Sequence, residues 1–404
     1  MNKPELLAPA GNLEKLKIAL IYGADAVYVG GKNFSLRAFG GNFTDDELKI
    51  AVDFAHSMNK KIYVAVNIFA HNDDIEELKN FLKFLDDIRV DAVLISDLGV
   101  FSLAKELTNL EIHISTQANI TNYKTVEMWK NLGASRVVLA RELTHDEIVN
   151  IKKNSAIELE MFIHGAMCIS YSGRCYLSHY LTGRDGNQGE CTHSCRWKYN
   201  LVEEKRSGEY FEVSEDDRGS YVMNSKDLCL LPCLDKVIES GVSSLKIEGR
   251  MKSVHYVASV VKVYRQAIDD LMQNAELRIK NEWIEELDKV AHRPYTTGFF
   301  KSDGSSTEIY DTSKAKQSII FLGIVRDFDP LTKIATVEQR GKMEIDQQIE
   351  ILQPHDKNFS QVLTEMTDEE GNFINSAPHA QQIVKIKFLQ DVEKWSLIRT
   401  LKQK

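Results

Sequence analysis

Residues 5–30 read ELLAPAGNLEKLKIALIYGADAVYVG, and this stretch decides the class of fold. An apolar run at 6–9 is followed by a helical pattern at 12–22 and by a second β-rich run at 26–30. A strand, a helix and a second strand in this order form a β-α-β unit, whose two strands lie parallel in one sheet. The stretch therefore predicts an α/β protein built on a parallel sheet.

The same alternation of short β-rich runs and longer helical patterns continues as far as residue 272. Further strands are predicted at 62–67, 92–96, 112–116, 137–140, 158–164 and 245–248. Further helices are predicted at 45–58, 74–88, 98–107, 123–132, 145–153, 227–239 and 254–272. Eight strand–helix pairs over this length predict a TIM-type (β/α)8 barrel. An open doubly wound sheet has the same local pattern and is the alternative.

The domain organisation follows from where this alternation stops. Residues 1–272 are predicted to form the barrel, and residues 165–224 are a long insertion after its seventh strand. Loops between a strand and the next helix usually have about 2 to 6 residues, so an insertion of this size is typical of a functional segment. Residues 273–314 are predicted to be a junction. Short alternating strands over residues 315–404 predict a small C-terminal all-β barrel domain.

The composition of the 404-residue chain is that of a globular protein, with 43% hydrophobic and 27% charged residues. Its formal net charge of −9 argues against a protein that coats nucleic acid through a broad cationic surface. No apolar run approaches the roughly 20 residues that span a bilayer, and the N terminus lacks a secretory signal pattern. We therefore expect a cytoplasmic protein without membrane contact. In that compartment the six cysteines are not expected to form a disulfide framework, and any clustering among them indicates metal or redox chemistry.

Four of the six cysteines lie in the insertion: Cys168, Cys175, Cys191 and Cys195. They stand among glycine, serine and arginine residues, whereas a buried structural cysteine normally lies in an apolar strand or helix. Four thiolates bind either structural zinc or an iron–sulfur cluster. The gaps of six, fifteen and three residues differ from the paired CxxC spacing of zinc sites and favour a cluster. Both metals remain open on the residues alone.

The other two cysteines, Cys229 and Cys233, lie in the predicted helix 227–239. Their spacing of four residues matches the apolar stripe of an amphipathic helix, so core packing is their expected role. Cys229 stands near the start of that helix and is kept as a reserve ligand for the metal.

Polar side chains follow the ends of several predicted barrel strands. The active sites of such barrels lie at the C-terminal ends of the strands, where these side chains would converge. Each has an ordinary alternative as a helix cap, a turn residue or part of a surface ion pair. Asp97 and Glu142 belong to this group without an assigned role. Catalytic roles are expected for Glu248, His164 and Asn67, and substrate-binding roles for Arg141 and Gln117.

The segment 246–253 reads KIEGRMKS and connects the eighth strand with the eighth helix. Free backbone N–H groups and the helix dipole favour an anion at such a place. Arg250 adds a guanidinium that matches a carboxylate at two atoms, and Lys252 adds a point charge. Arg250 and Lys252 are therefore predicted to bind an acidic small molecule or a phosphate.

Several of these motifs resemble the collagenase-like peptidase family. The segment NQGECTHSCRW at 187–197 is similar to the branch of this family that acts in forming 5-hydroxyuridine at the wobble position of tRNA. The resemblance covers nearly the whole chain. The other matching segments are E-x-F-x-x-G-A-M-C at 160–168, G-x-C-x-x-S at 173–178, ELLAPAGN at 5–12, GADAVYVG at 23–30 and KIEGR at 246–250.

The resemblance implies a more specific function than composition or spacing does. A member of this branch hydroxylates tRNA uridine without molecular oxygen, depends on prephenate and carries an iron–sulfur cluster, expected to be 4Fe-4S. The fourth ligand stays open between Cys195 and Cys229. Prephenate is a dicarboxylate, which fits the anion site expected at Arg250 and Lys252. tRNA is the expected partner, and a family paralogue is a candidate partner subunit. The implied cluster ligands are Cys168, Cys175, Cys191 and Cys195.

The alternative function is that of a collagenase-like peptidase, a hydrolase whose cysteines hold a structural metal. The sequence has no Gly-x-Ser-x-Gly motif and no His-Glu-x-x-His motif, and it shows no assignable nucleophile–base pair. Because catalytic triads are defined by geometry rather than by order in the chain, the peptidase stays open at this point.

Overall fold

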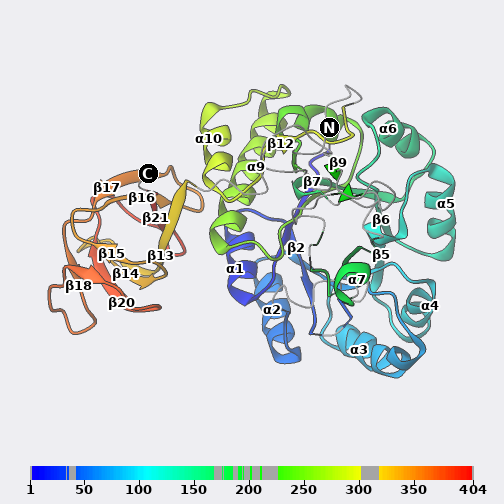
Figure 1. The fold of residues 1–404 in the computed structure, drawn as a ribbon, viewed down its shortest axis with the longest axis horizontal. Helices are drawn as coiled ribbons and strands as arrows, with labels where there is room; N and C mark the ends of the chain where they lie inside the picture. The colour runs from blue at the N-terminus through cyan, green and yellow to red at the C-terminus, as the bar shows by residue number, and fades with distance from the viewer. Residues whose placement is uncertain are drawn as a thin grey trace.

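The computed structural model of the chain describes residues 2–32, 34–35, 42–167, 175, 177–184, 190–192, 194, 201–202, 210–211, 226–301 and 318–402. These residues form a parallel barrel, parts of an insertion at one end of it, and a C-terminal β domain (Figure 1). The largest hydrophobic cluster lies mainly between the barrel strands and the helices around them, and a second cluster fills the C-terminal domain.

Within the described residues, eight parallel strands close a barrel. Each strand pairs with the next one along the chain, and the last strand, β11, pairs with both β7 and β1, which closes the ring. The predicted TIM-type barrel is therefore confirmed, and the open doubly wound sheet is excluded. The strands are β1 (Glu5–Pro9), β2 (Ala26–Gly30), β3 (Lys61–Val66), β4 (Ala92–Ile95), β5 (Glu111–Ile114), β6 (Arg136–Val138), β7 (Glu158–Ala166) and β11 (Ser244–Ile247).

Helices surround the barrel and bury their apolar faces against the strands (Figure 1). Asn12, Thr44 and Ser253 begin three of them, each accepting a hydrogen bond from an N–H group of the first turn. Among the described residues, none of the helices is both long and apolar enough to cross a membrane. The barrel helices are α1 (Leu13–Ile21), α2 (Asp45–Ser57), α3 (Ile75–Asp87), α4 (Leu98–Leu107), α5 (Tyr123–Leu132), α6 (His145–Lys153), α8 (Leu234–Glu239) and α9 (Val254–Asn274).

The predicted helix over residues 227–239 is wrong in its first half. Asp227–Cys229 form a strand, β10, that pairs antiparallel with the end of β7. A 3-10 turn follows at Leu231–Cys233, and the helix begins only at Leu234. Pro232 has no N–H to donate inside a helix, and the long strand β7 offers its edge to the preceding residues. Pairing with a distant strand therefore outweighs the local helical pattern.

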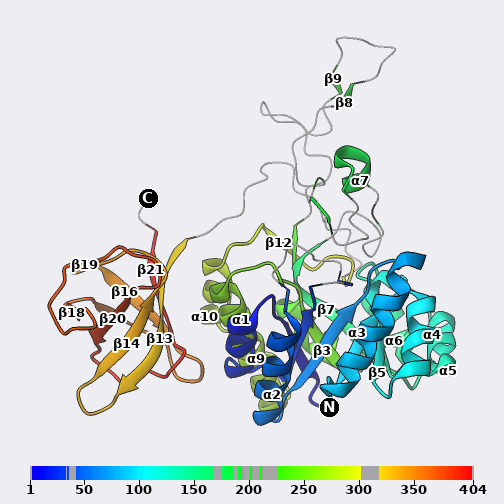
Figure 2. The ribbon, with the colours of Figure 1, turned by 90° about the horizontal axis from the view of Figure 1, so that it is seen from below.

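The insertion lies at the C-terminal ends of the barrel strands. It contains the helix α7 (Leu177–Thr182) and the antiparallel pair β8 (Leu201–Val202) and β9 (Tyr210–Phe211). In Figure 2 these elements extend beyond the barrel on the side opposite to the N terminus. This is the face of the barrel at which the active site is expected.

The region between the barrel and the C-terminal domain contains regular structure as well. Helix α10 (Asn281–Lys289) packs against α9, where the indole of Trp283 donates a hydrogen bond to Gln266 at 3.1 Å. The short strand β12 (Tyr295–Thr296) pairs with β10 and so extends the edge of the barrel sheet.

The C-terminal domain is all-β, as predicted. Its main sheet has seven antiparallel strands in the order β17-β16-β21-β13-β14-β20-β18 and forms a half-barrel around its own hydrophobic core. A separate pair, β15 with β19, completes it. The strands are β13 (Ile319–Asp329), β14 (Ile334–Gln339), β15 (Met343–Glu344), β16 (Gln348–Leu352), β17 (Phe359–Val362), β18 (Met366–Thr367), β19 (Ser376–Ala377), β20 (Ile383–Lys387) and β21 (Leu397–Leu401).

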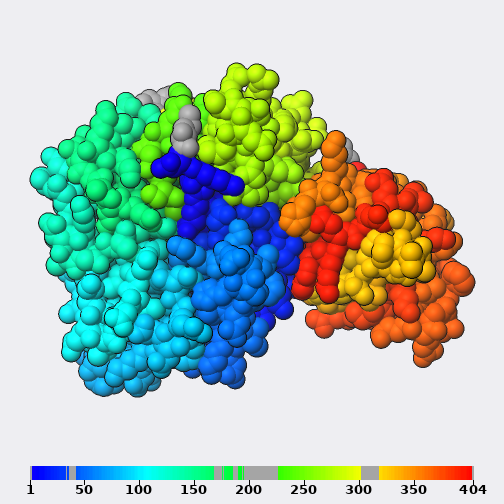
Figure 3. All heavy atoms as spheres, turned by 180° about the vertical axis from the view of Figure 1, so that it is seen from behind, coloured from blue at the N-terminus to red at the C-terminus, as the bar shows by residue number. Residues whose placement is uncertain are grey.

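A buried ionic network joins the C-terminal domain to the barrel. Arg399 on β21 is fully buried, and its guanidinium pairs at two atoms with Glu286 on α10. It also donates to Glu350 on β16 at 3.0 Å and to the ring nitrogen of His255 on α9 at 2.8 Å. Figure 3 shows the orange and red domain in contact with the blue and yellow-green segments of the barrel. Buried charges of the C-terminal domain are therefore paired with buried groups of α9 and α10, and this pairing stabilises the contact between the two domains.

Replacing Arg399 by methionine is expected to lower the free energy of unfolding by about 3 to 5 kcal/mol, because buried Glu286 would lose its bidentate partner and keep only Lys289, at 3.8 Å. Denaturant-induced unfolding of the full chain measures the change. Arg278→Met is the matched control, since Arg278 pairs with Glu276 on the surface and should leave the midpoint nearly unchanged. An Arg399→Met midpoint equal to that of the wild type would contradict the role of the network.

His255 should make this interface sensitive to pH. Burial, together with the charge of Arg399, lowers the pKa of His255 to about 4, whereas an unfolded histidine has a pKa of about 6.5. The unfolded chain therefore binds a proton that the folded chain does not, so stability is lost as the pH falls from about 6.5 toward 4. This group alone should lower the free energy of unfolding by about 1.3 kcal/mol between about pH 7.5 and 5.5.

The His255→Gln variant isolates this effect, because glutamine keeps an acceptor for Arg399 but does not titrate. Unfolding measured at both pH values should show a smaller loss of stability in the variant than in the wild type. Identical pH dependence in the two proteins would show that His255 is not the group responsible.

Candidate functional site

The ends of β3, β4 and β5 are joined by hydrogen bonds at the mouth of the barrel. Asn67 follows β3, and its side-chain amide donates to the Ser115 hydroxyl at 3.3 Å. The Ser96 hydroxyl donates to the Asn67 carbonyl oxygen at 3.1 Å. Gln117 lies two residues beyond Ser115, in the 3-10 turn Thr116–Ala118. The structure thus places two of the predicted site residues, Asn67 and Gln117, in one part of the mouth.

Arg250 follows β11 and is buried against the end of β2. Its guanidinium donates to the Ser35 hydroxyl at 2.7 Å and to the Asn42 side-chain oxygen at 3.3 Å. A Cβ atom on Gly30 would lie 2.4 Å from Nη1 of Arg250, so glycine is needed there to leave room for the guanidinium. With 3% of its surface exposed, Arg250 forms part of the wall around the mouth.

Lys252, the other residue of the predicted anion site, is held by different elements. Its ammonium donates to the Ala291 carbonyl oxygen at 2.9 Å and lies 3.8 Å from the Asp227 carboxylate. It also lies 5.1 Å from the ring centroid of Tyr256. Lys252 is therefore fixed between β10, α9 and the segment before β12, whereas Arg250 contacts the segments that follow β2.

Glu248 is fixed at the end of β11 by its backbone. Its N–H group donates to the His164 carbonyl oxygen at 2.8 Å, and its own carbonyl accepts from the Tyr256 hydroxyl at 2.9 Å. Gly165 has a φ of +107°, and a Cβ atom there would lie 2.4 Å from the Glu248 carbonyl oxygen. Glycine at this position lets the ends of β7 and β11 approach closely and so positions Glu248 at the mouth.

His164 lies on β7 but faces away from the barrel interior. A register shift between β7 and β11 pairs Phe162 with Lys246 and then His164 with Ile247. Ile247 belongs to the hydrophobic cluster between the barrel and its helices. The irregularity therefore turns His164 outward, toward α9, although simple alternation from Phe162 would have turned it into the barrel.

The imidazole of His164 lies in an aromatic pocket behind β7. Burial, together with the charge of Lys252, lowers its pKa to about 3, so the ring is neutral at pH 7. Its Nε2 atom is buried and has no hydrogen-bond partner in the described part of the chain. The structure does not bring His164 together with Asn67 or Arg250. Its ring neighbours, at centroid distances of 5.3 to 6.0 Å, are Tyr256, Tyr264 and Tyr295.

Cys229, the reserve metal ligand, is the strand partner of His164. It is 5% exposed, and its sulfur lies 3.8 Å from the Tyr264 hydroxyl on α9. Burial raises the pKa of this thiol, whereas a metal ligand has to be a thiolate. Its surroundings fit packing in the core better than ligation of a metal.

Two of the four insertion cysteines, Cys175 and Cys191, lie on segments that are bonded to each other. The N–H group of Thr192 donates to the Ser178 hydroxyl at 3.0 Å, and the two hydroxyl oxygens lie 2.9 Å apart. The Thr192 hydroxyl oxygen lies 2.6 Å from that of Ser194. Both cysteines are half-buried. We call Ser178, Thr192 and Ser194 the hydroxyl chain; it joins the segment after Cys175 to the segment after Cys191.

The other two predicted ligands, Cys168 and Cys195, lie outside the described residues. Their neighbours Met167 and Ser194 are buried, with 7% and 1% of their surfaces exposed. In the part of the chain that the structure describes, no group of three or more His, Cys, Asp or Glu residues is arranged to hold a metal. The four-cysteine ligand set therefore stays a prediction.

The barrel interior contains charged residues that were not among the predicted site residues. Glu160 on β7 is fully buried, and its carboxylate accepts from Lys246 on β11 at 2.7 Å and from Arg136 on β6 at 3.2 Å. Arg136 also donates to Glu5 on β1 at 2.6 Å. In β7, inward-facing Glu160 alternates with apolar Leu159 and Met161. This two-residue period in the sequence could have indicated that Glu160 faces the barrel interior.

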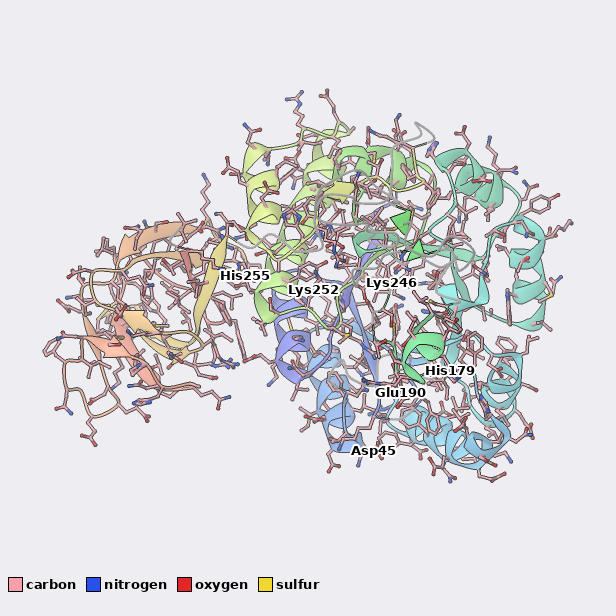
Figure 4. All side chains as sticks on the ribbon, in the orientation of Figure 1. Asp45, His179, Glu190, Lys246, Lys252 and His255 are labelled. Carbon is pink, nitrogen blue, oxygen red and sulfur yellow. The ribbon has the colours of Figure 1, made fainter. Side chains whose placement is uncertain are left out.

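These interior charges extend toward the mouth. Burial alone would raise the pKa of Glu160, but the charges of Lys246 and Arg136 outweigh it and keep the carboxylate ionised. On the mouth side, Arg141 lies after β6 with its guanidinium carbon 3.7 Å from the ring centroid of Phe162. Figure 4 labels Lys246 near the middle of the ring of strands, above the insertion helix that carries His179 in that view.

Comparison with known proteins shows close relatives over the full length of the chain. It is 44% identical over 400 residues to tRNA hydroxylation protein P1 of Bacillus subtilis (strain 168), covering 98% of this chain and 94% of that protein. It is 36% identical over 439 residues to tRNA hydroxylation protein P of Escherichia coli (strain K12), covering 97% and 95%. The 23S rRNA 5-hydroxycytidine C2501 synthase of Escherichia coli (strain K12) is 33% identical over 317 residues, with 77% and 47% covered.

Two family models confirm the resemblance inferred from the motifs. The model of peptidase family U32 matches residues 11–309. The model of the peptidase family U32 C-terminal domain matches residues 317–399. The chain therefore belongs to peptidase family U32.

Proposed function

We propose that this chain is a tRNA-modifying enzyme that forms 5-hydroxyuridine at the wobble position, with prephenate as co-substrate and a 4Fe-4S cluster as cofactor. The names of its relatives support hydroxylation of RNA, since two are named for tRNA and one for 23S rRNA. The structural observation that carries the proposal is the hydroxyl chain, which joins the cysteine-bearing segments of the insertion.

The donor set of the insertion fits an iron–sulfur cluster. Cys175 and Cys191 are half-buried, whereas burial raises the pKa of the Cys229 thiol and disfavours the thiolate that a metal needs. The hydroxyl chain would hold the segments after Cys175 and Cys191 together, and outer interactions of this kind orient metal ligands. When bound, the cluster would supply electron transfer or a Lewis-acidic iron. The proposed ligands are Cys168, Cys175, Cys191 and Cys195.

The mouth of the barrel offers groups suited to a pyrimidine base. Chemistry at C5 requires the base to leave its stack and to expose an edge. The amide groups of Asn67 and Gln117 both donate and accept hydrogen bonds, as the edge of uracil does. We assign these two residues to binding the base, and Glu248, fixed at the end of β11, to acid–base chemistry.

The proposal predicts that tRNA from a strain lacking this gene and any paralogue contains no 5-hydroxyuridine. Mass spectrometry of digested tRNA measures the nucleoside. The wild-type gene should restore it, and genes carrying Cys175→Ser or Cys191→Ser should not, because each removes a cluster thiolate. Cys233→Ala is the matched control, since Cys233 is buried in the core and its loss should leave the modification intact.

Two outcomes would contradict the proposal. Unchanged 5-hydroxyuridine in the deletion strain would remove the chain from this reaction. Full restoration by both Cys175→Ser and Cys191→Ser would show that the insertion cysteines are not required.

The hydroxyl chain gives a second prediction that spares every thiol. Thr192→Val removes the hydroxyl that lies between Ser178 and Ser194, and it should weaken metal retention by about tenfold or more. Iron retained by the anaerobically purified protein against a chelator measures this. Thr192→Ser keeps the hydroxyl and is the matched control. Equal retention by Thr192→Val and the wild type would show that the hydroxyl chain does not support the cluster.

The name of the family keeps a peptidase as the alternative function. A peptidase would cleave gelatin or a collagen peptide without any change to tRNA. Cleavage by the purified chain, combined with normal 5-hydroxyuridine in the deletion strain, would favour that alternative.

A further inference from the structure

Lys246 has more hydrogen-bond donors than partners inside the barrel. Its side chain belongs to a residue that is 4% exposed, and its ammonium has three N–H groups. In the described part of the chain it has one acceptor, Glu160, at 2.7 Å. Its other contacts are with the rings of Tyr28, at 4.5 Å, and Phe162, at 5.4 Å. Buried N–H groups without acceptors are costly, and such groups cluster at binding sites.

The single acceptor reaches Lys246 from the N-terminal end of the barrel. The register pairs Ser244 with Glu160 and Lys246 with Phe162. Glu160 is therefore level with Ser244 and lies two residues further from the mouth than the pair Lys246 and Phe162. Arg136, the second cation on Glu160, stands at the start of β6 and therefore lies on that same side. Toward the mouth, the described residues give Lys246 no carboxylate partner.

Arg141 brings a second positive charge to the mouth side of Lys246. Its guanidinium carbon lies 3.7 Å from the centroid of Phe162, the ring that the Lys246 ammonium also approaches. Burial lowers the pKa of Lys246; Glu160 opposes this lowering, and the charge of Arg141 adds to it. The two positive charges therefore repel each other. A bound anion that contacts both side chains would attract each of them and offset this repulsion.

We infer that Lys246 and Arg141, which both approach the ring of Phe162, form a binding site for the carboxylate of a small organic acid. The inference rests on the proposed function and deepens it, because prephenate is such an acid. A phosphate in the backbone of folded tRNA would not reach a residue that is 4% exposed inside the ring of strands (Figure 4). Lys246 lies within the barrel, whereas Arg250 and Lys252 bond to protein groups in its wall.

Calorimetric titration of the full chain with prephenate, and separately with inorganic phosphate, tests this site. Lys246→Met should weaken prephenate binding by about tenfold or more, because a charge-assisted hydrogen bond is lost. Glu160→Gln should leave the affinity unchanged or increase it, since it removes the carboxylate that competes for Lys246. A salt bridge with a purely structural role would instead make both changes harmful to binding.

Two further variants separate binding from folding. Lys246→Met combined with Glu160→Gln leaves no unpaired charge between these positions, and it should bind prephenate as weakly as Lys246→Met alone. Lys124→Met changes an exposed lysine on α5 and should bind as the wild type does. Thermal unfolding of each variant confirms that it is folded.

Three results would overturn the site: wild-type affinity in the double variant, equal weakening by Glu160→Gln and Lys246→Met, or tighter binding of phosphate than of prephenate. The titration contains no tRNA, so its result is independent of the modification assay. A wild-type chain that binds no prephenate but is needed for 5-hydroxyuridine would refute this site and leave the role in hydroxylation standing. If the chain binds prephenate through these residues but is not needed for 5-hydroxyuridine, the binding site would stand and the role in hydroxylation would be refuted.

Discussion

The buried carboxylate of Glu160 is the group on which the barrel interior depends. Removing a charge from water costs several kcal/mol, and the cost is offset only when the charge is paired and hydrogen-bonded. Lys246 and Arg136 provide this pairing, and Arg136 reaches Glu5 as well. Strands β1, β6, β7 and β11 are thereby connected across the interior, where TIM barrels usually contain layers of branched aliphatic side chains. Between these strands the barrel interior is charged, and a separate apolar cluster is formed by Leu7, Ala26, Tyr28, Tyr63, Ala92 and Leu94.

Strand β7 links this interior to the insertion. Up to Phe162 its alternate side chains face the interior, and the register shift then turns His164 outward into an aromatic pocket. The strand ends at Ala166, immediately before the insertion with its four cysteines. The same strand therefore positions the interior charges and begins the segment that carries the proposed cluster. The charged part of the barrel interior therefore lies close to the start of the cysteine-bearing insertion, as the proposed binding of an organic acid near a cluster requires.

The sequence predicted the strands of the barrel well because the alternation of β and α patterns is a local property. It failed at Asp227–Cys229, where pairing with the end of β7 and the nearby Pro232 outweigh the helical spacing of the two cysteines. The orientation of His164 depends on a register shift between strands, which no local pattern encodes. The partners of Lys246 likewise come from strands far apart in the chain, although its alternation with apolar neighbours marked it as facing inward.

The central claim is that the insertion cysteines hold a 4Fe-4S cluster at the mouth of this charged barrel. The most direct measurement is the iron, sulfide and zinc content of the wild-type chain purified without oxygen, together with its Mössbauer spectrum. About four irons and four sulfides per chain, with the spectrum of a cubane cluster, are expected. About one zinc per chain, without iron or sulfide, would contradict the claim and assign the cysteines a structural role.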